Sequence, residues 1–194
     1  MTRRLAMSLC ADRGLTIMTR ITAQTHATLD GVIEATPAEA YAPYFSDEGR
    51  KATIDLAHAA DALLLGRETW QQLGRAWRSE SGPLADRLNA MPKYVVSRTL
   101  ESADEWERTT IVGYDDVAGL RERHDLLSYG CGGLARDLVR DGLLDELRIW
   151  VTPVVAGRGR RLFDEPSELL ALKLAEARAF PGGAVRLIYG PAKL

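Results

Sequence analysis

The feature that most constrains this chain is an alternation, from residue 20 onward, of short runs of β-forming residues with longer runs of helical periodicity. Parallel strands need a long crossover between them, and a helix is the usual crossover. The alternation therefore predicts an α/β fold in which helices cover both faces of a largely parallel sheet. We expect strands at 21–28, 62–65, 93–97, 109–112, 126–129, 146–155, 172–179 and 184–189, with 146–155 the longest.

Turn and cap residues refine this outline. The tripeptide Pro181-Gly182-Gly183 predicts a tight turn, so the final two strands should form an antiparallel hairpin. Ser46 and the two acids after it are typical of a capped helix start. Further helices are expected from Gly66, from Asp115, and after the second glycine-rich stretch, where the apolar stripe is Leu134, Leu138, Val139 and Leu143.

Charge and cysteine content narrow the function classes. The 194 residues carry 25 Lys+Arg and 27 Asp+Glu, a net charge of −2. Without a basic field, neither nucleic acid nor a membrane is expected as a partner, and no stretch approaches the ~20 apolar residues of a membrane span. Cys10 and Cys131 could form at most one bridge and lack the spacing of a metal site. We therefore expect no metal and a reduced, cytoplasmic setting.

The length of the chain allows one sizeable core, so we expect a single domain over residues 18–194. The first seventeen residues make a poor signal peptide, because Asp12 and Arg13 interrupt their short apolar run. Met18 directly precedes a strand-like segment. We interpret residues 1–17 as a mobile tail or a mis-set start.

Two places in the chain show a strand, then glycine, then a helix start: residues 63–69 (LLLGRET) and 127–134 (LSYGCGGL). Such junctions lie at the carboxyl ends of parallel strands, where open α/β sheets bind ligands. Helix N-termini present unpaired N–H groups there, and glycine lets a phosphate approach the backbone. Together the two junctions predict a pyrophosphate clamp, although each glycine alone could simply relieve a tight turn.

Known motifs restrict the nucleotide further. The second stretch is neither a Rossmann fingerprint, which would need glycine at Ala135, nor a Walker loop, and zinc-protease, α/β-hydrolase and zinc-deaminase motifs are missing. Arg67 and Arg98 each follow a predicted strand end, and guanidinium suits a bidentate grip on phosphate. If both hold one ribose phosphate, the ligand is NADP; otherwise they are solvated surface charges. Ser97 could donate to the same phosphate or simply end its strand.

The ordered set of these motifs resembles the dihydrofolate-reductase-like superfamily. It is most similar to the reductase (C-terminal) domain of bacterial riboflavin-biosynthesis deaminase/reductase proteins and its stand-alone relatives. The resemblance spans about residues 20–191. The segments that carry it are ITAQTHATLDGVIE from residue 21, LGRETW from 65, PKYVVSR from 92, GCGGLA from 130, and PVV from 153 with Gly157 and the RLF tripeptide from 161.

The resemblance implies a three-layer α/β/α fold around a mixed, mostly parallel sheet, with NADPH laid across its carboxyl edge. His26 and Ala27 would contact the nicotinamide through their main chain, and Asp30 would flank the substrate as a candidate catalytic residue. The residues that would hold the cofactor's phosphates are Gly66, Arg67 and Thr69, then Ser97 and Arg98 at the ribose phosphate, and Gly130, Cys131, Gly132, Gly133 and Leu134 at the pyrophosphate.

Two departures from the family pattern are visible. Glu68 places a carboxylate beside the expected phosphates, where the family often has a basic or neutral residue. Folate-reducing members anchor the pterin with a buried carboxylate on the first helix. Here Asp47, Glu48 and Asp55 have no apolar frame of that kind, and the first two are better explained as helix-start acids. A true dihydrofolate reductase is therefore not expected.

The leading hypothesis is an NADPH-dependent, pyrimidine-reductase-like enzyme that transfers hydride to a small heterocyclic or carbonyl substrate. Asp30, Gln24 and a water are the candidates to stabilise the hydride acceptor, with Gln24 also a substrate-binding candidate. The arginines at 158, 160 and 161 could hold a substrate phosphate or form a charged loop. The sequence of the 34–45 loop does not identify the substrate.

Two alternatives stay open. The first is an NADP-binding regulatory or interaction module without turnover. The second is a structural dimer built on the 146–155 strand and the helix that carries Trp70 and Trp77, with Arg67 and Arg98 serving only in ion pairs. A homodimer is expected under the enzyme hypothesis as well.

Overall fold

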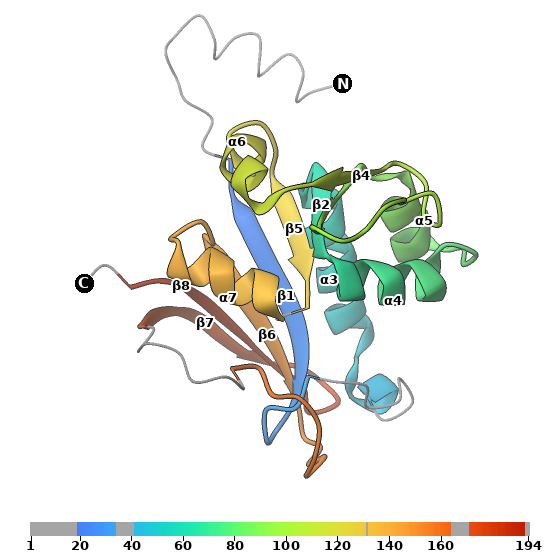
Figure 1. The fold of residues 1–194 in the computed structure, drawn as a ribbon. Helices are drawn as coiled ribbons and strands as arrows, with labels where there is room; N and C mark the ends of the chain where they lie inside the picture. The colour runs from blue at the N-terminus through green and yellow to red at the C-terminus, as the bar shows by residue number, and fades with distance from the viewer. Residues whose placement is uncertain (1–18, 34–40, 131, 164–170, 193–194) are drawn as a thin grey trace, which may run out of the picture.

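The structure is a computed structural model that describes residues 19–33, 41–130, 132–163 and 171–192. Its centre is an eight-stranded sheet in the order β4-β3-β2-β5-β1-β6-β8-β7 (Figure 1). The expected 1–17 tail and Cys131 lie outside the described residues. The strands are β1 (Ile21–Thr28), β2 (Ala62–Gly66), β3 (Lys93–Val96), β4 (Thr109–Val112), β5 (Leu126–Tyr129), β6 (Glu146–Thr152), β7 (Leu172–Ala179) and β8 (Val185–Pro191).

Strand directions follow the predicted pattern. The six strands from β4 to β6 are parallel, whereas β8 pairs antiparallel with both β6 and β7. The C-terminal antiparallel hairpin is therefore confirmed. The parallel strands bring all their carboxyl ends to one edge of the sheet, so residues that follow β1, β2, β3, β5 and β6 meet there.

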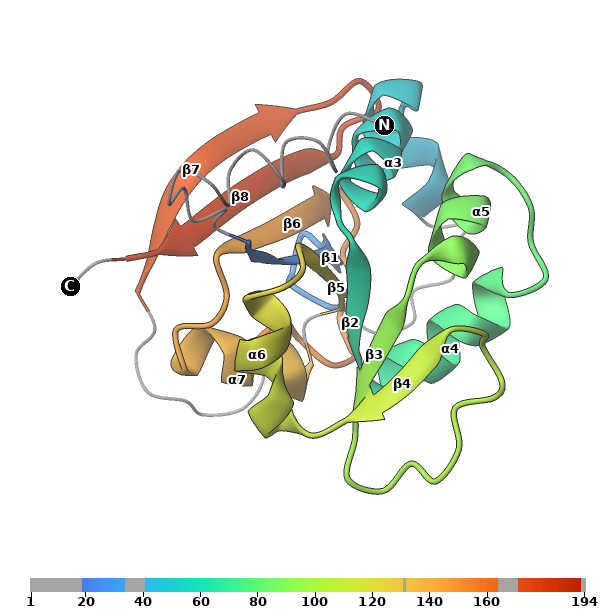
Figure 2. The same cartoon turned by 90° about the horizontal axis from the view of Figure 1, so that it is seen from above.

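Helices cover both faces of the sheet, as Figure 2 shows in an edge-on view. One layer contains α3 (Asp47–Ala59), α4 (Arg67–Trp77) and α5 (Pro83–Ala90), and the other contains α6 (Val117–Arg121) and α7 (Gly133–Arg140). Short 3₁₀ helices, η1 (Ala42–Tyr44) and η2 (Tyr114–Asp116), precede α3 and α6. Separate apolar cores fill the two interfaces, so the three-layer α/β/α architecture is confirmed. Among the described residues, no helix has the length and apolar character that crossing a bilayer would require.

Local signals explain most element boundaries. The Ser46 hydroxyl accepts the Gly49 N–H at 3.2 Å and caps α3, as predicted, a contact worth about 1 kcal/mol in such helices.

The prediction that 146–155 is the longest strand was wrong: β6 ends at Thr152 and is shorter than β1. Pro153 cannot donate to the ladder, and the Val154 N–H turns back to the Thr152 carbonyl at 2.8 Å.

Two helix predictions also needed correction. The apolar stripe was extended to Leu143, but α7 ends at Arg140 because Gly142, with φ of +67°, turns the chain and the Leu143 N–H bonds back to the Leu138 carbonyl. The helix α5 was not predicted, although Pro83 at its first turn is a typical helix-start signal.

The structure bears on both interface elements of the structural-dimer alternative. Strand β6 lies inside the sheet between β1 and β8. Trp70 is 1% exposed and donates its Nε1–H to Thr109 of the same chain at 3.1 Å, while Trp77 packs on the same core. Trp70 is therefore a core residue, and Trp77 is partly buried against the same core.

Strand β1 has side chains of different kinds on its two faces. Ile21, Ala23 and Ala27 pack in the core beneath α6 and α7. The alternate residues face α3 and are all polar, yet three of them are at most 3% exposed. These alternate residues are Thr22, Gln24, His26 and Thr28.

Candidate functional site

The two glycine junctions occupy neighbouring positions on the carboxyl edge, because β2 and β5 are adjacent strands. Helix α4 has Gly66 as its N-cap and α7 has Gly132, and neither cap supplies a side-chain hydrogen bond. The first N–H groups of both helices therefore point to this edge without a side-chain acceptor at the cap. Two such helix ends side by side form a positive, anion-accepting corner.

The junctions also touch each other. Gly130 has φ of +80°, and a Cβ at this position would come within 3.0 Å of the Thr69 Oγ1. On the other side, a Cβ at Gly66 would meet the Leu134 Cβ at 3.8 Å. Gly130 is thus required both by its backbone conformation and by the space that Thr69 leaves. The structure brings Gly66, Thr69, Gly130 and Leu134 into one cradle.

Arg67, the first residue of α4, lies next to this cradle, and Arg98 lies on the turn that follows β3. The Ser97 hydroxyl accepts the N–H groups of Thr99 and Leu100 at 3.2 and 3.0 Å and fixes the turn. Arg67 Nη1 donates to the Thr99 Oγ1 at 2.9 Å, so the guanidinium from the first glycine junction rests on the turn that carries Arg98. Arg98 is exposed and has no hydrogen bond or ion pair within the described part of the chain.

The carboxylate of Glu68 has a partner that the sequence did not reveal. Arg160, in the loop after β6, places Nη1 3.2 Å from Glu68 Oε2. The pair reaches across the edge from the β6 loop to the start of α4, passing the ends of β1 and β5. The negative charge beside the cradle is therefore compensated, and Arg160 is an additional cation at this edge.

Asp30 joins two loops at the carboxyl ends of β1 and β6, which lie together at the bottom of Figure 1. Its carboxylate accepts the Thr28 hydroxyl at 2.6 Å and the main-chain N–H groups of Ala156 and Gly157 at 3.0 and 2.9 Å. Arg161 donates to the Asp30 carbonyl. The Thr28 hydrogen bond, followed by the two main-chain bonds, lowers the pKa of Asp30 to about 2. At neutral pH the carboxylate holds no proton, and its catalytic role stays a prediction.

Strands β1 and β5 separate just before the two loops that Asp30 joins. Their pairing ends at Gln24, whose carbonyl accepts the Gly130 N–H at 3.0 Å, whereas β1 stays paired with β6 as far as Thr28. Main-chain groups two residues apart on a strand point to the same side. The main chain of His26 therefore faces the gap that opens between β1 and β5. The Ala27 carbonyl points the other way and accepts the Thr152 hydroxyl at 3.2 Å.

Side chains on the α3 face form a buried polar group beside that gap. Gln24 is 1% exposed, and its Oε1 accepts the Trp150 Nε1–H at 3.1 Å. The His26 ring stacks on Trp150 with centroids 6.3 Å apart and meets Phe45 edge-on at 4.9 Å. Burial lowers the pKa of His26 to about 4, so the imidazole is neutral at physiological pH. The sequence missed Tyr129 and Trp150 here, and their in-register positions beside Gln24 and His26 are the signal that finds them.

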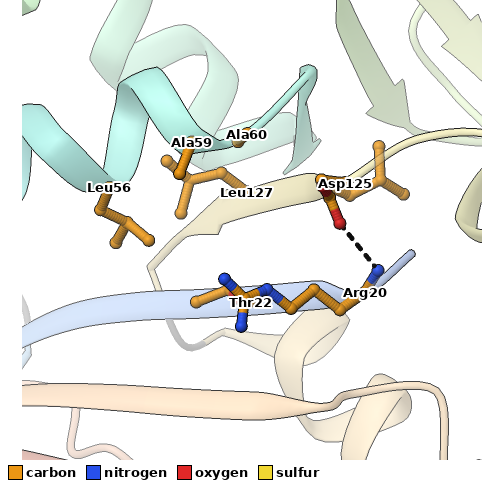
Figure 3. Close-up of a pocket in the computed structure, with 8 residues that line it drawn as sticks. Arg20, Thr22, Leu56, Ala59, Ala60, Asp125 and Leu127 are labelled. Atoms are coloured by element: carbon orange, nitrogen blue, oxygen red, sulfur yellow. Dashed lines mark hydrogen bonds between the residues drawn. The ribbon is translucent and has the colours of Figure 1, made fainter. Parts of the chain in front are cut away.

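Two hollows in the described chain lie at the opposite edge of the sheet. One, of about 10 Å³, is roomy enough for about one water and is lined by Thr22, Leu56 and Leu127, with the Arg20 N–H bonded to Asp125 nearby (Figure 3). Another, of about 280 Å³, lies where α7 ends beside β6 and β8. Neither contains a predicted site residue.

Within the described residues, no three His, Cys, Asp or Glu side chains approach closely enough to hold a metal.

Comparison with known proteins decides the family. The family model described as the RibD C-terminal domain matches residues 19–186 of this chain. The chain belongs to the RibD C-terminal domain family. The glycine cradle and the strands from β1 to β7 fall inside the matched range.

Relatives of this RibD-type domain cover nearly all of the chain. The uncharacterized protein YyaP of Bacillus subtilis (strain 168) is 28% identical over 180 residues, which span 88% of this chain and 94% of YyaP. A putative riboflavin biosynthesis protein from Shewanella sp. PV-4 has the same fold, with a TM-score of 0.72 at 20% identity over 90% of this chain and 100% of that one.

Two further solved structures share the fold, one of them over only part of its length. The Thermotoga maritima diaminohydroxyphosphoribosylaminopyrimidine deaminase/5-amino-6-(5-phosphoribosylamino)uracil reductase aligns with a TM-score of 0.62 at 13% identity, over 90% of this chain and 57% of that protein. A pyrimidine reductase-like protein from Corynebacterium diphtheriae aligns with a TM-score of 0.60 at 15% identity, over 92% of this chain and 94% of its own. The RibD-type domain of this chain thus corresponds to one part of a bifunctional protein.

Proposed function

We propose that this RibD-type domain is an NADPH-dependent reductase that transfers hydride to a small heterocyclic or carbonyl substrate, in the manner of a pyrimidine reductase. Family membership supports an oxidoreductase. The observation that carries the proposal is the contact between the two glycine junctions, where Thr69 packs on Gly130 between two helix ends whose caps lack side-chain acceptors.

The residues present fit a dinucleotide that bears an extra phosphate. The cradle of Gly66, Thr69 and Gly130 would hold the pyrophosphate on helix N–H groups, together with Gly132, Gly133 and Leu134. Arg67 and Arg98, on adjacent strand ends, would hold the ribose phosphate with Ser97. When bound, NADPH supplies the hydride, and the chain supplies position and a water-poor surface.

The chain's own residues account for the rest of the site. The main chain of His26 faces the gap between β1 and β5, where a nicotinamide ring would meet it. Asp30 ties the loops after β1 and β6 into one platform beside that gap. Because its carboxylate is ionised and accepts three hydrogen bonds, we assign Asp30 a positioning role and leave the proton for the acceptor to water.

Replacement of Arg98 tests the ribose-phosphate assignment. A charge-assisted hydrogen bond contributes about 1.5–3 kcal/mol, so Arg98→Ala should weaken NADPH binding about tenfold or more and change NADH binding little. NADPH fluorescence titration gives both constants. Arg75→Ala is the matched control, because Arg75 is an exposed arginine in the last turn of α4, away from the cradle.

The outcomes separate the functions. No NADPH binding at millimolar concentration would remove every cofactor-based function. Equal losses for NADPH and NADH in Arg98→Ala would contradict the ribose-phosphate role. Tight NADPH binding without oxidation across a panel of heterocycles and carbonyl compounds would identify a cofactor-binding module without turnover.

A further inference from the structure

An exposed ion pair reaches across the carboxyl edge of the sheet. Arg160, in the loop after β6, places Nη1 and Nη2 at 3.2 and 3.3 Å from the same Oε2 of Glu68, in the first turn of α4. Strand β2, which leads into α4, is separated from β6 by β5 and β1 (Figure 2). Neighbouring strands lie about 4.8 Å apart, so the pair joins elements about 14 Å apart in the sheet. It therefore crosses the ends of two strands.

The two strands that the pair crosses border the proposed cofactor surface. Strand β5 ends next to Gly130, on which Thr69 packs, and the gap between β1 and β5 opens after Gln24. Glu68 directly precedes Thr69 in α4, so its end of the pair lies beside the cradle. The other end stands on the loops after β1 and β6. A dinucleotide that runs from the cradle to the gap follows the same path, so the pair must either close over it or be displaced by it.

Both ends of the pair stand on well-anchored main chain. The Arg160 carbonyl accepts the Ile33 N–H at 2.9 Å, and the next residue, Arg161, forms an antiparallel bridge with Val32. Glu68 belongs to the regular helix α4. The side chains themselves are 43% exposed for Arg160 and 72% exposed for Glu68. Opening the pair therefore needs only rotation of two side chains and no movement of the loop or the helix.

The neighbouring charged groups have other partners. Arg67 donates to the turn after β3, which lies on the other side of β2 from Arg160. Arg161 donates to the Asp30 carbonyl. The Asp30 carboxylate accepts one hydroxyl and two main-chain N–H groups of its own loops. Glu68 therefore meets Arg160 without competition from these groups.

An exposed pair of this kind is suited to repeated opening. Exposed ion pairs contribute little to stability, because water solvates the separated charges almost as well. The expected equilibrium constant in favour of the closed pair is about 1–5. A cofactor that can leave only when the pair is open is then released about two to six times more slowly than it would be without the pair.

We propose that the Glu68–Arg160 ion pair is a strap that closes over the bound dinucleotide and controls how fast the cofactor is exchanged. When the strap is closed, it holds the cofactor against the edge between the cradle and the gap, and release requires the strap to open. The strap adds no group to the hydride-transfer step. This inference rests on the proposed reductase function and deepens it, because it assigns the rate of cofactor exchange to two side chains.

The rate of NADPH release tests the strap directly. Stopped-flow fluorescence of the full chain should give a dissociation rate constant about two- to sixfold higher in Glu68→Gln than in wild type. The sign is decisive, because a carboxylate that only repels the cofactor phosphates would make this variant release NADPH more slowly. The control Glu122→Gln removes an exposed carboxylate at the end of α6, on the opposite edge of the sheet, and should leave the rate unchanged.

A double-mutant cycle supplies the second readout. Arg160→Gln should also release NADPH faster, and the double variant Glu68→Gln/Arg160→Gln should match Glu68→Gln, because a broken strap cannot be broken twice. Association should rise more than release in Glu68→Gln, since the substitution opens the path and also removes repulsion towards the cofactor phosphates. This variant should therefore bind NADPH more tightly and yet release it faster, a combination that neither effect produces alone.

Two results would overturn the strap and leave the reductase proposal standing. Unchanged or slower release in Glu68→Gln would mean that the bound cofactor displaces the pair. A double variant that releases NADPH faster than Glu68→Gln would mean that Arg160 holds the cofactor directly. In both cases the wild-type protein still binds NADPH in an equilibrium titration. A wild-type protein that does not bind NADPH would remove the reductase proposal and the strap together.

Discussion

A methyl group added at Gly130 is expected to destabilise the protein in two separable ways. The first is conformational: with φ of +80°, a residue with a Cβ is strained by about 1–2 kcal/mol. The second is steric: the new carbon would lie 3.0 Å from the Thr69 Oγ1 and 3.5 Å from its Cγ2, and crowding of this kind costs about 1–3 kcal/mol. Gly130→Ala should therefore lose about 2–5 kcal/mol.

Removing the obstructing side chain should recover only the steric part. In Thr69→Ala, the nearest remaining atom is the Cβ at 3.9 Å, an ordinary contact. Thermal denaturation of wild type, both single variants and the double variant gives the coupling energy, which we expect to be at least about 1 kcal/mol in favour of the double variant. At this chain length, 1 kcal/mol corresponds to about 2–4 °C in Tm.

The control for this cycle is Gly142, where φ is +67° and no atom lies within 4 Å of an added Cβ. Gly142→Ala should show the conformational cost alone and add to Thr69→Ala without coupling. If the Gly130 cycle is also additive within about 0.5 kcal/mol, the two glycine junctions do not touch as described, and the cradle that supports the proposed cofactor site is refuted.

Three further predictions concern single residues. Glu68→Gln removes a carboxylate beside the cradle, so NADPH should bind severalfold more tightly in fluorescence titrations, with the gain shrinking at high salt; a gain that does not depend on salt contradicts this reasoning. Lys93 is fully buried and donates to three main-chain carbonyls at 2.9–3.1 Å. Lys93→Met leaves those carbonyls without their donor and should lose about 1–3 kcal/mol in urea denaturation, and a loss well below about 1 kcal/mol would argue against those bonds. The pKa of Asp30, about 2 in the folded state and below its ordinary value, means that its stabilisation is complete above about pH 4 and disappears as pH falls towards 2. Asp30→Asn should therefore flatten the fall in Tm on acidification, and an unchanged Tm profile would count against the platform.

The sequence predicted the parts of the fold that local chemistry determines. Strand and helix alternation, the Ser46 cap and the Pro181-Gly182-Gly183 turn all act over a few residues, and the structure contains each of them. The extent of 146–155 was overestimated because its apolar pattern continues past Pro153, although a proline cannot donate to a ladder. The helix α5 was missed even though Gly82-Pro83 precedes its apolar residues.

The candidate site was less predictable because its contacts join distant segments. The two glycine junctions could be placed on one edge from topology alone, but the Thr69–Gly130 contact depends on how closely two helices approach. The partners of Asp30 at Ala156 and Gly157 are more than one hundred residues away in the chain. The burial of Gln24 could not be predicted either, because a strand with polar residues at alternate positions normally exposes them to solvent.

The two-sided character of β1 has a consequence for how this domain could acquire new specificities. Even-numbered side chains from 22 to 28 line one layer, while Ala23 and Ala27 belong to the other. Under the proposed function, a substitution at Gln24 would act on the layer that holds the site, and the odd-numbered neighbours would go on anchoring α7. Substrate preference and scaffold stability could then diverge through alternate codons of a single short stretch of the gene.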